Sequence, residues 1–376
     1  MRFPDDVPTL SSGDVTLRAH RLDDLDAMVE QCVDPVSVQW TTVPLGFTRD
    51  NAVEFASKTV PQGWESGHEL AFAIESTHPG GKRRFSGTVS LVDRGGRRAE
   101  IAFGAHPAVR GRGVMTTSVN LLLDWGFAER GLETVLWMAN KDNYASRRIA
   151  WRTGFTFAGT ARRWMDHRGD YPDGWGATLH RDDSREPKSA WYDVPVIAGD
   201  RVTLRALAEK DAPAIVEACS DERTRHWLAA MPDPYTEQDA SEYMQSSAAR
   251  SAGGEGVNWA VADNATAAFL ANVGLPRMGR TDAEIGYWTH PAARGRGVMT
   301  EAVALVVRHA FIDVADGGLG LRRVWLKAAV GNTASQQVAR ANGFTEYGRE
   351  RKSERLGDGS YGDMLLFDLL ASEHHP

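Results

Sequence analysis

Apolar and polar positions alternate in some segments of the chain and recur every three or four residues in others. In the first half, the alternation in "DVTLRA" (14–19) predicts a strand. The apolar spacing of "DDLDAMVEQC" (23–32) predicts a helix, and the start signal in "TRDNAVEFASK" (48–58) predicts a second helix. Further strands are predicted at 70–76, 84–93 and 99–106.

Helical and strand patterns continue to alternate beyond this point. The segments "MTTSVNLLLDWGFAERG" (115–131) and "NYASRRIAWRTG" (143–154) have helical spacing, and the second ends at a glycine. "ETVLWMA" (133–139) and "WGATLHR" (175–181) are predicted strands. Strands with interleaved helices predict an α/β (α+β) fold with helices around one sheet.

The whole pattern occurs twice, because segments of the first half return in the same order in the second. A period this long is a complete domain, so the chain is a duplication. We expect an N-terminal domain at 10–180, a polar linker at 181–193 and a C-terminal domain at 194–371. The matching segments are "TLRAH" (16–20) and "TLRAL" (203–207), "AEIAFGAHP" (99–107) and "AEIGYWTHP" (283–291), and "NYASRRIAWRTGF" (143–155) and "NTASQQVARANGF" (332–344).

The composition is that of a globular protein, since 42% of the 376 residues are hydrophobic and 25% are charged. The sequence has no apolar run long enough to span a bilayer and no secretory signal, so we expect a cytoplasmic protein that does not bind membranes. The net charge of −7 argues against a nucleic-acid partner. Cys32 and Cys219 occupy the same place in each half, and we expect them to pack as small apolar residues without a disulfide.

One loop recurs almost unchanged, as "HPAVRGRGVMT" (106–116) and "HPAARGRGVMT" (290–300), identical at 10 of 11 positions. Each copy joins a strand to a helix, and the first N–H groups of a helix lack internal partners. The glycines allow a ligand to approach closely and the arginines add positive charge, which together favour a phosphate or pyrophosphate site. The structural alternative is a tight turn with solvated arginines. The chain has neither a Walker pattern nor the third glycine of the dinucleotide fingerprint.

The "AEI" strand, the arginine–glycine loop and the N-x-x-S…GF segment together resemble the GNAT superfamily of acetyl-CoA-dependent N-acetyltransferases. "TLRA" and "GVMTEAV" (297–303) resemble its RimJ/RimL-like branch. The resemblance covers nearly the whole chain and implies two tandem GNAT domains, each with a mixed, mostly antiparallel sheet. It implies that the loop binds acetyl-CoA, although Met115 and Met299 depart from the Gly or Ala of the wider superfamily. The scattered histidines and two distant cysteines suggest no metal site. The implied contacts to acetyl-CoA are Arg110, Gly111, Arg112, Gly113, Val114, Met115, Thr116 and Asn143 in the first half, and Arg294, Gly295, Arg296, Gly297, Val298, Met299, Thr300 and Asn332 in the second.

The resemblance also implies a general base. Some GNAT enzymes carry a glutamate at the positions of Glu100 and Glu284, where it removes the proton of the acceptor amine, often through water. Strand alternation places Glu100 on the same face as Ala102 and Gly104. The alternative is a glutamate at the end of a strand that bonds to an arginine or a backbone amide.

A general acid is needed for the departing thiolate. The tyrosine that many GNAT enzymes use is replaced by alanine in both copies, so Ser146 and Ser335 of N-x-x-S are the expected proton donors. Asn143 and Asn332 would then meet the pantetheine arm. The alternative is that both serines are residues of a first helical turn and that both asparagines are N-caps.

In each half, the resemblance implies that the acceptor lies against the segment that differs most between the copies, 38–50 or 225–239, so the two pockets should differ. His106 and His290 are expected as loop residues. The leading hypothesis is an N-acetyltransferase whose acceptor is either a protein N-terminus or a small-molecule amine. The alternative is a non-catalytic acyl-CoA-binding sensor or scaffold. We also expect the halves to pack as an intramolecular pseudo-dimer, and a further homodimer stays open.

Overall fold

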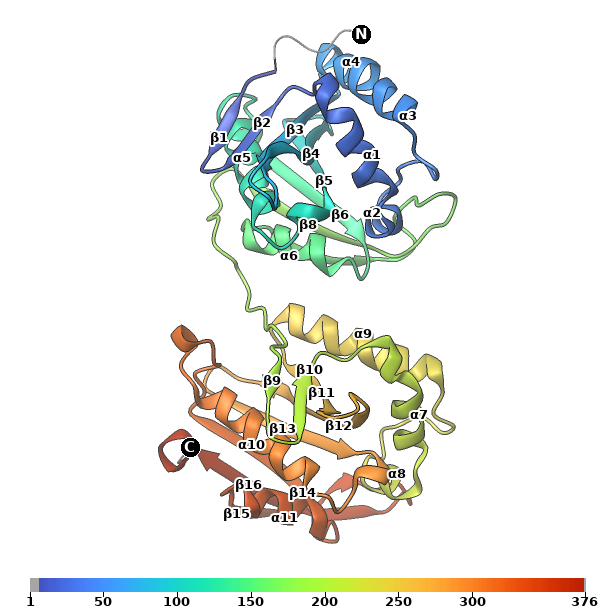
Figure 1. Ribbon diagram of the computed structural model, residues 1–376. Coiled ribbons are helices and arrows are strands. Elements are labelled where there is room, and N and C mark those ends of the chain that lie inside the picture. Colours follow the sequence, from blue (N-terminus) through green and yellow to red (C-terminus); the bar gives the residue numbers. More distant parts are fainter. Residues whose placement is uncertain (1–6, 375–376) are drawn as a thin grey trace. The chain divides into compact units, whose positions relative to one another are not determined.

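Eight strands in each half of the chain pair into one sheet, as the computed structural model shows (Figure 1). The structure describes residues 7–374, and the chain divides into two units, Met1–Lys188 and Ser189–Pro376. The strands of the first half are β1 (Leu10–Ser12), β2 (Val15–Arg18), β3 (Glu69–Thr77), β4 (Arg83–Asp93), β5 (Arg98–Ala105), β6 (Thr134–Asn140), β7 (Thr156–Ala161) and β8 (Gly174–His180). Those of the second half are β9 (Ile197–Ala198), β10 (Val202–Arg205), β11 (Val257–Asp263), β12 (Phe269–Met278), β13 (Asp282–Thr289), β14 (Arg323–Ala329), β15 (Thr345–Arg355) and β16 (Tyr361–Leu370).

The helices of the two halves also correspond, except that the third helix is interrupted in the first half and continuous in the second. The first half has α1 (Leu25–Val33), α2 (Pro35–Trp40), α3 (Arg49–Glu54), a π-helical turn η2 (Phe55–Thr59), α4 (Val60–Ser66), α5 (Val114–Ala128) and α6 (Tyr144–Arg152). The second half has α7 (Ala212–Ser220), α8 (Glu222–Trp227), α9 (Glu237–Gly253), α10 (Val298–Phe311) and α11 (Thr333–Ala341). Short 3₁₀ helices are η1 (Leu22–Asp24), η3 (Pro107–Val109), η4 (Glu209–Asp211), η5 (Pro291–Ala293), η6 (Val314–Asp316) and η7 (Ala371–Glu373).

Strand order is the same in both sheets. It is β1-β2-β3-β4-β5-β6-β8-β7 in the first half, and β9-β10-β11-β12-β13-β14-β16-β15 in the second. Among the described residues, the parallel pairs are β5 with β6 and β13 with β14, and the other paired strands are antiparallel. The predicted fold, two mixed and mostly antiparallel sheets with flanking helices, is therefore confirmed.

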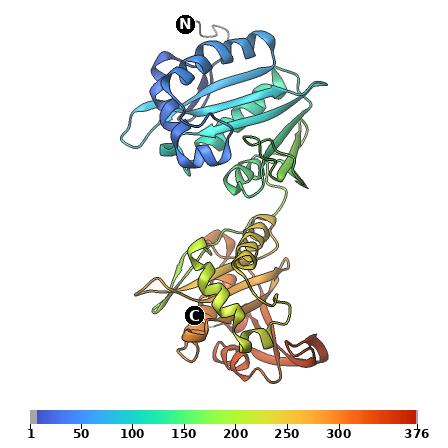
Figure 2. The same ribbon diagram turned by 90° about the vertical axis from the view of Figure 1, so that its right-hand side faces the viewer.

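Two separate apolar clusters cover the two faces of each sheet. In the first half, α5 packs with Phe72 of β3 on one face, whereas α1 and α3 pack with Ala73 on the other face. The second half repeats this arrangement, with α10 over Trp259 and with α7 and α9 over Ala260. Successive side chains of a strand point to opposite faces, which explains why neighbouring residues belong to different clusters. Figure 2 shows helices on both faces of the first-half sheet.

The helix that the sequence predicts at 48–58 continues to Ser66 in the structure and is interrupted by the π-helical turn η2. Pro61 lies one residue beyond this turn, after Val60, and has no N–H group to donate to the preceding turn, which disturbs a regular α-helix. The corresponding helix α9 has no proline and is unbroken from Glu237 to Gly253.

Both cysteines are buried and free, Cys32 in α1 and Cys219 in α7. Burial raises the pKa of Cys32 to about 11, which keeps this thiol protonated and unreactive at neutral pH. The expectation that the two residues pack as small apolar side chains is confirmed.

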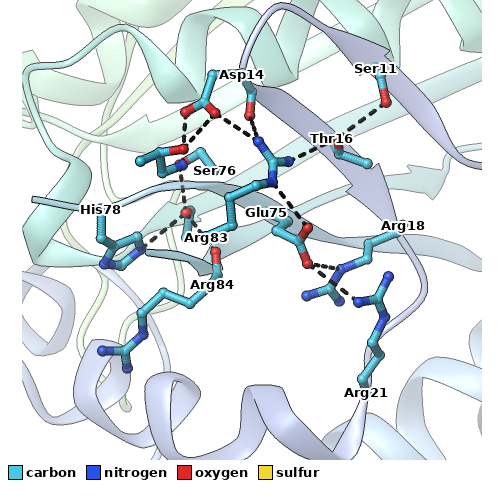
Figure 3. A network of polar contacts seen from close by, with 12 residues as sticks. Ser11, Asp14, Thr16, Arg18, Arg21, Glu75, Ser76, His78, Arg83 and Arg84 are labelled. Carbon is cyan, nitrogen blue, oxygen red and sulfur yellow. Dashed lines mark hydrogen bonds and ion pairs between the residues drawn. The ribbon is translucent and has the colours of Figure 1, made fainter. Parts of the chain in front are cut away.

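A buried arginine anchors β2 in the first half. Arg18 is 4% exposed, and its two Nη atoms donate to the two carboxylate oxygens of Asp24 at 2.8 Å each. Its Nε donates to Glu75 Oε2, also at 2.8 Å, and Arg83 links Glu75 to Asp14 in the same network (Figure 3). The second half keeps the first pair as Arg205 and Asp211, without a counterpart of Glu75.

Replacing Asp24 with alanine should lower the free energy of unfolding of the first half by about 3–5 kcal/mol, because the Arg18 charge stays buried after its main partner is lost. Denaturant unfolding of the full chain measures this. The control is Asp26→Ala, which breaks an exposed pair with Arg49 (side chains 78% and 60% exposed) and should cost about 1 kcal/mol or less. Equal effects of the two substitutions would contradict a structural role for the buried pair.

Candidate functional site

The recurring loop follows the last residue of β5 in the first half and of β13 in the second. His106 Nδ1 accepts a hydrogen bond from Ala108 N at 3.2 Å, and His290 Nδ1 accepts one from Ala292 N at 3.3 Å. Each histidine therefore caps a short 3₁₀ helix at the start of the loop. This agrees with the expectation that they are loop residues.

The end of the loop presents the open N-terminus of a long helix. Gly113 precedes α5 with a φ of 78° and has no side chain to cap the helix. Among the hydrogen bonds of residues 7–374, none is donated by the amides of Val114, Met115 or Thr116. The equivalent amides of α10 (Val298, Met299, Thr300) are open in the same way within this described range. Free amides and the helix dipole make both termini suitable for an anion.

The first arginine of each loop is paired with side chains of a neighbouring helix. Arg110 Nη2 lies 2.6 Å from Asp34 Oδ1 and donates to Ser37 Oγ at 2.9 Å. Arg294 contacts Asp221 and Thr224 in the same manner. These pairs join the loop to the first helices of each half, so the side chains of both arginines have protein partners. Sequence reasoning missed both aspartates, although the repeated "VDP" and "SDE" segments held the signal.

The second arginine of each loop is exposed. Arg112 Nη1 donates to the carbonyl oxygen of Thr77 at 3.3 Å, and the carbonyl oxygen of Arg296 accepts from Arg201 at 2.9 Å. Their guanidinium groups are at the surface, beside the open helix termini, where they add positive charge.

Parallel pairing ends early between the two central strands of each sheet. The pairing of β5 with β6 ends at Ile101 and Trp137, although both strands continue beyond these residues. Within the residues that the structure describes, the pairing of β13 with β14 begins at Asp282 and Arg323 and ends at Glu284 and Trp325. The last residues of β5 and β6, and those of β13 and β14, are therefore not paired with each other.

A cavity of about 1430 Å³ lies at this separation in the second half. It brings together most of the residues that the sequence predicted there, and Arg296 is outside its lining. A neighbouring cavity of about 540 Å³ shares Glu284 with it, so Glu284 faces both. The predicted residues that line the large cavity are Glu284, Arg294, Gly295, Gly297, Val298, Met299, Thr300, Asn332 and Ser335.

The two candidate bases differ in their partners. Glu284 Oε2 lies 3.2 Å from Arg277 Nη1, and burial raises the pKa of this carboxyl group, although the Arg277 and Lys327 cations oppose the shift. Glu100 Oε2 instead accepts from both Nε and Nη2 of Arg94, at 2.9 and 2.5 Å. Both glutamates thus have the arginine partner that the alternative interpretation expected, and the contact is closer and twofold at Glu100.

The asparagine and serine of N-x-x-S are arranged alike in both halves. Asn143 Oδ1 accepts from Ser146 N at 3.1 Å, and Asn332 Oδ1 accepts from Ser335 N at 3.2 Å. Both asparagines are therefore N-caps, of α6 and α11. The cap fixes each serine in the first turn of its helix, and in the second half it leaves Ser335 on the wall of the large cavity.

Each serine hydroxyl has a different partner. Ser146 Oγ accepts from Trp137 Nε1 at 3.0 Å, whereas Ser335 Oγ lies 3.0 Å from the hydroxyl of Tyr287. The partner comes from β6 in the first half and from β13 in the second, and Phe103 stands at the position equivalent to Tyr287. Burial raises the pKa of Tyr287 to about 12, so the phenol stays protonated at neutral pH. Sequence reasoning missed both partners.

Strand alternation places the candidate base, Glu284, and the candidate acid, Ser335, on opposite faces of the sheet. Glu284 and Trp288 lie on the face of β13 that meets α7 and α9, and Tyr287 lies on the opposite face with Ser335. The two candidate groups reach a common cavity because β13 and β14 separate beyond Glu284. This arrangement allows one reactant to enter from each side of the sheet.

Residues 7–374 contain neither a cluster of metal-ligand side chains nor a helix that could span a membrane. Within that range, no group of three or more His, Cys, Asp or Glu side chains is arranged to hold a metal ion. None of the described helices combines the length and the apolar character required to cross a bilayer.

Comparisons with known proteins agree with the duplicated site. The family model described as "Acetyltransferase (GNAT) domain" matches residues 14–156 and again 201–345. YdaF, a provisionally named ribosomal N-acetyltransferase of Bacillus subtilis (strain 168), is 28% identical over 181 residues, which are 46% of this chain and 93% of YdaF. The ribosomal-protein-serine acetyltransferase of Escherichia coli (strain K12) is 38% identical over 85 residues, 23% of this chain and 44% of that protein.

Solved structures include Mycobacterium smegmatis RimJ in complex with CoA-disulfide, with a TM-score of 0.44 and 21% identity over 49% of this chain and 90% of that one. The two matches of the family model together span most of the chain, one in each half. The chain therefore belongs to the GNAT family of acetyltransferases and carries two domains of this family.

Proposed function

We propose that this acetyltransferase moves the acetyl group of acetyl-CoA to a primary amine, with one acetyl-CoA site in each half. The observation that carries the proposal is the cavity of the second half, which joins the open N-terminus of α10, Ser335 and Glu284. The helix terminus suits the pyrophosphate. The serine hydroxyl and the carboxylate supply the acid and the base that aminolysis of a thioester needs.

In the second half, the neutral amine attacks the acetyl carbonyl carbon, so that a C–N bond forms and the C–S bond breaks. Glu284 takes the proton that the amine nitrogen loses, directly or through water. Ser335 gives its hydroxyl proton to the departing thiolate, and the proton that Glu284 has taken returns to the serine through solvent. The Tyr287 hydroxyl, which donates to the Ser335 carbonyl oxygen at 3.1 Å and lies 3.0 Å from Ser335 Oγ, holds the serine in place. The products are an acetamide and free CoA. No charge accumulates on sulfur, which lowers the barrier to its departure.

The first half is proposed to use the same groups, Glu100 and Ser146. Trp137 Nε1 is a donor only, so it occupies a lone pair of Ser146 Oγ and leaves the hydroxyl proton available for the thiolate. Arg94 holds the Glu100 carboxylate with two hydrogen bonds. Both bonds fall on Oε2, so this oxygen is already occupied when the amine must lose its proton, and we expect the first half to be the slower one.

Two relatives support a protein acceptor, because their names refer to ribosomal proteins or to the ribosome. An N-terminal amine of a protein is therefore the acceptor that we favour, and a cytoplasmic location fits it. A small-molecule amine is the second candidate. The predicted boundaries of the domains, and their association as a pseudo-dimer, stay predictions.

Release of free thiol from acetyl-CoA, measured across a panel of N-terminal peptides and small amines, tests this function. We expect release that depends on both the amine and the enzyme. An enzyme that binds CoA but releases thiol no faster than buffer with every amine would favour the non-catalytic sensor or scaffold.

A further inference from the structure

We infer that the two halves accept different classes of amine. The first half takes an amine that carries a hydrogen-bonding group, such as a hydroxyl, beside the reacting nitrogen. The second half takes an amine with an apolar or aromatic group at that place. This inference rests on the proposed acetyl transfer and specifies its acceptor.

The wall of the acceptor side is visible in the second half. The large cavity is lined both by Glu284 and by Trp288, two residues of β13 that lie on the same face of the strand. Four further aromatic side chains line this cavity, Trp227, Tyr235, Tyr243 and Tyr287, of which Tyr287 belongs to the opposite face of β13. An acceptor whose nitrogen is beside Glu284 can therefore place its next group against an aromatic wall, where apolar surface is removed from water.

The first half has a reciprocal exchange at this wall. Gly104 stands where the second half has Trp288, and Gln31 of α1 stands where α7 has Ala218. Gln31 Nε2 lies 2.9 Å from the position that a Cβ atom on Gly104 would take. The amide of Gln31 thus covers Gly104, the residue that corresponds to Trp288. The first half has an amide at this wall and the second half an indole.

Two polar atoms at this wall of the first half have no partner. Among the described residues, no hydrogen bond reaches the buried Gln31 Oε1 or His20 Nδ1, and His20 is only 1% exposed. His20 Nε2 lies 3.3 Å from Thr88 Oγ1, and Thr88 pairs with Gly104 across β4 and β5. Cross-strand partners share one face of the sheet, so His20 and Gln31 belong to one polar cluster.

In the second half, the equivalent side chains either are apolar or have their hydrogen-bonding atoms paired. Leu207 replaces His20, and Asn272 replaces Thr88. Asn272 Oδ1 accepts from the Tyr243 hydroxyl at 2.8 Å, and its Nδ2 donates to the carbonyl oxygen of Trp259 at 3.0 Å. Unpaired buried polar atoms destabilise a fold unless a ligand or water pairs with them. Their restriction to one half therefore points to a ligand group that only this half has to recognise.

The chemistry of the cluster defines that group. Gln31 Oε1 is an acceptor, so its partner must be a donor such as a hydroxyl or an amide N–H. Burial lowers the pKa of His20 to about 4, so the ring is neutral at pH 7 and its Nδ1 can accept or donate according to the tautomer. A hydroxyl can donate to Gln31 Oε1 or pair with His20 Nδ1, whereas a methyl group of the same size can do neither. Sites built around such a bond discriminate strongly against analogues that lack it.

The test uses the full chain with one half silenced. Gly295→Glu is designed to silence the second half and Gly111→Glu the first, because each introduces a negative charge into one phosphate loop. Acceptors are peptides that start with serine, with 2-aminobutyrate, which replaces the hydroxyl by a methyl group, or with phenylalanine. Each kcat/KM is measured by thiol release.

With only the first half active, we expect serine to exceed 2-aminobutyrate by about 10-fold or more. Gln31→Met keeps the length of the side chain and removes its hydrogen bonds, so this variant should bring the ratio close to one without changing CoA affinity. With only the second half active, phenylalanine should exceed serine by about 10-fold or more. Trp288→Gly, which copies the first half, should reduce that preference.

Thiol release without selectivity in the first half, or a serine preference that Gln31→Met leaves intact, would overturn this inference. So would one common order of acceptors in both halves. These outcomes differ from failure of the proposed function, in which none of the peptides or amines supports thiol release. Unchanged melting temperature and CoA affinity of the Gln31→Met variant exclude misfolding as the cause of a lost preference.

Discussion

Replacing Glu284 with glutamine should lower kcat of the second half by about 10²–10⁴-fold, the usual contribution of a general base. The amide has nearly the same shape but cannot take the proton of the amine. The assay is thiol release by the full chain that carries Gly111→Glu, so that only the second half contributes. CoA affinity should stay within about threefold, because Glu284 is not part of the loop that we assign to the pyrophosphate.

The pH dependence follows from the same group. Burial raises the pKa of Glu284, and the carboxylate is a base only when it is deprotonated. The rate of the second half should therefore fall as the pH decreases through this raised pKa, and Glu284→Gln should lose that part of the profile. The matched control is Glu100→Gln with only the first half active, where the Arg94 pair predicts a smaller loss. Equal losses in the two halves would contradict the difference that we assign to Arg94.

Replacing Ser335 with alanine should lower kcat of the second half by about 10–1000-fold, with CoA affinity nearly unchanged, if its hydroxyl protonates the thiolate. Ser146→Ala should do the same in the first half. Tyr287→Phe removes the hydroxyl at 3.0 Å from Ser335 Oγ and should cost less than Ser335→Ala, because the serine itself remains. Wild-type turnover in the Ser146→Ala/Ser335→Ala variant would rule out this assignment.

The general fold was predictable because its signals are local and occur twice. Alternation fixed the central strands, and the glycine stop fixed the end of the helix at 143–154. The strands β7 and β15 were not predicted, because "TFAGTA" and "TEYGRERKSER" bury few side chains and show no regular apolar face. The π-helical turn was missed for another reason. We assign it to Pro61, whose missing N–H group removes a hydrogen bond from the turn before it. The spacing of apolar residues carries no signal of this loss.

The candidate site was predictable as a set of motifs, but its pairs of side chains were not. The loop glycines and N-x-x-S are contiguous in sequence and recur. Trp137 and Tyr287, by contrast, come from different strands in the two halves, so a comparison of the copies does not reveal that they serve the same atom. Gly104 and Gln31, which correspond to Trp288 and Ala218, are far apart in sequence, and their contact is seen only in the folded chain.

The central claim is that each half holds one acetyl-CoA at its loop, and titration calorimetry with CoA tests it most directly. Gly111 and Gly295 have φ values of 74° and 71°, and no atom lies within 4 Å of a Cβ built on either, so a glutamate side chain at these sites meets no neighbour but strains the loop backbone. The matched Gly→Ala variants carry the same strain without the charge and serve as controls. We predict a stoichiometry near two for the natural chain and near one for each of Gly111→Glu and Gly295→Glu. A stoichiometry near one in the natural chain, abolished by one substitution and unaffected by the other, would contradict the account.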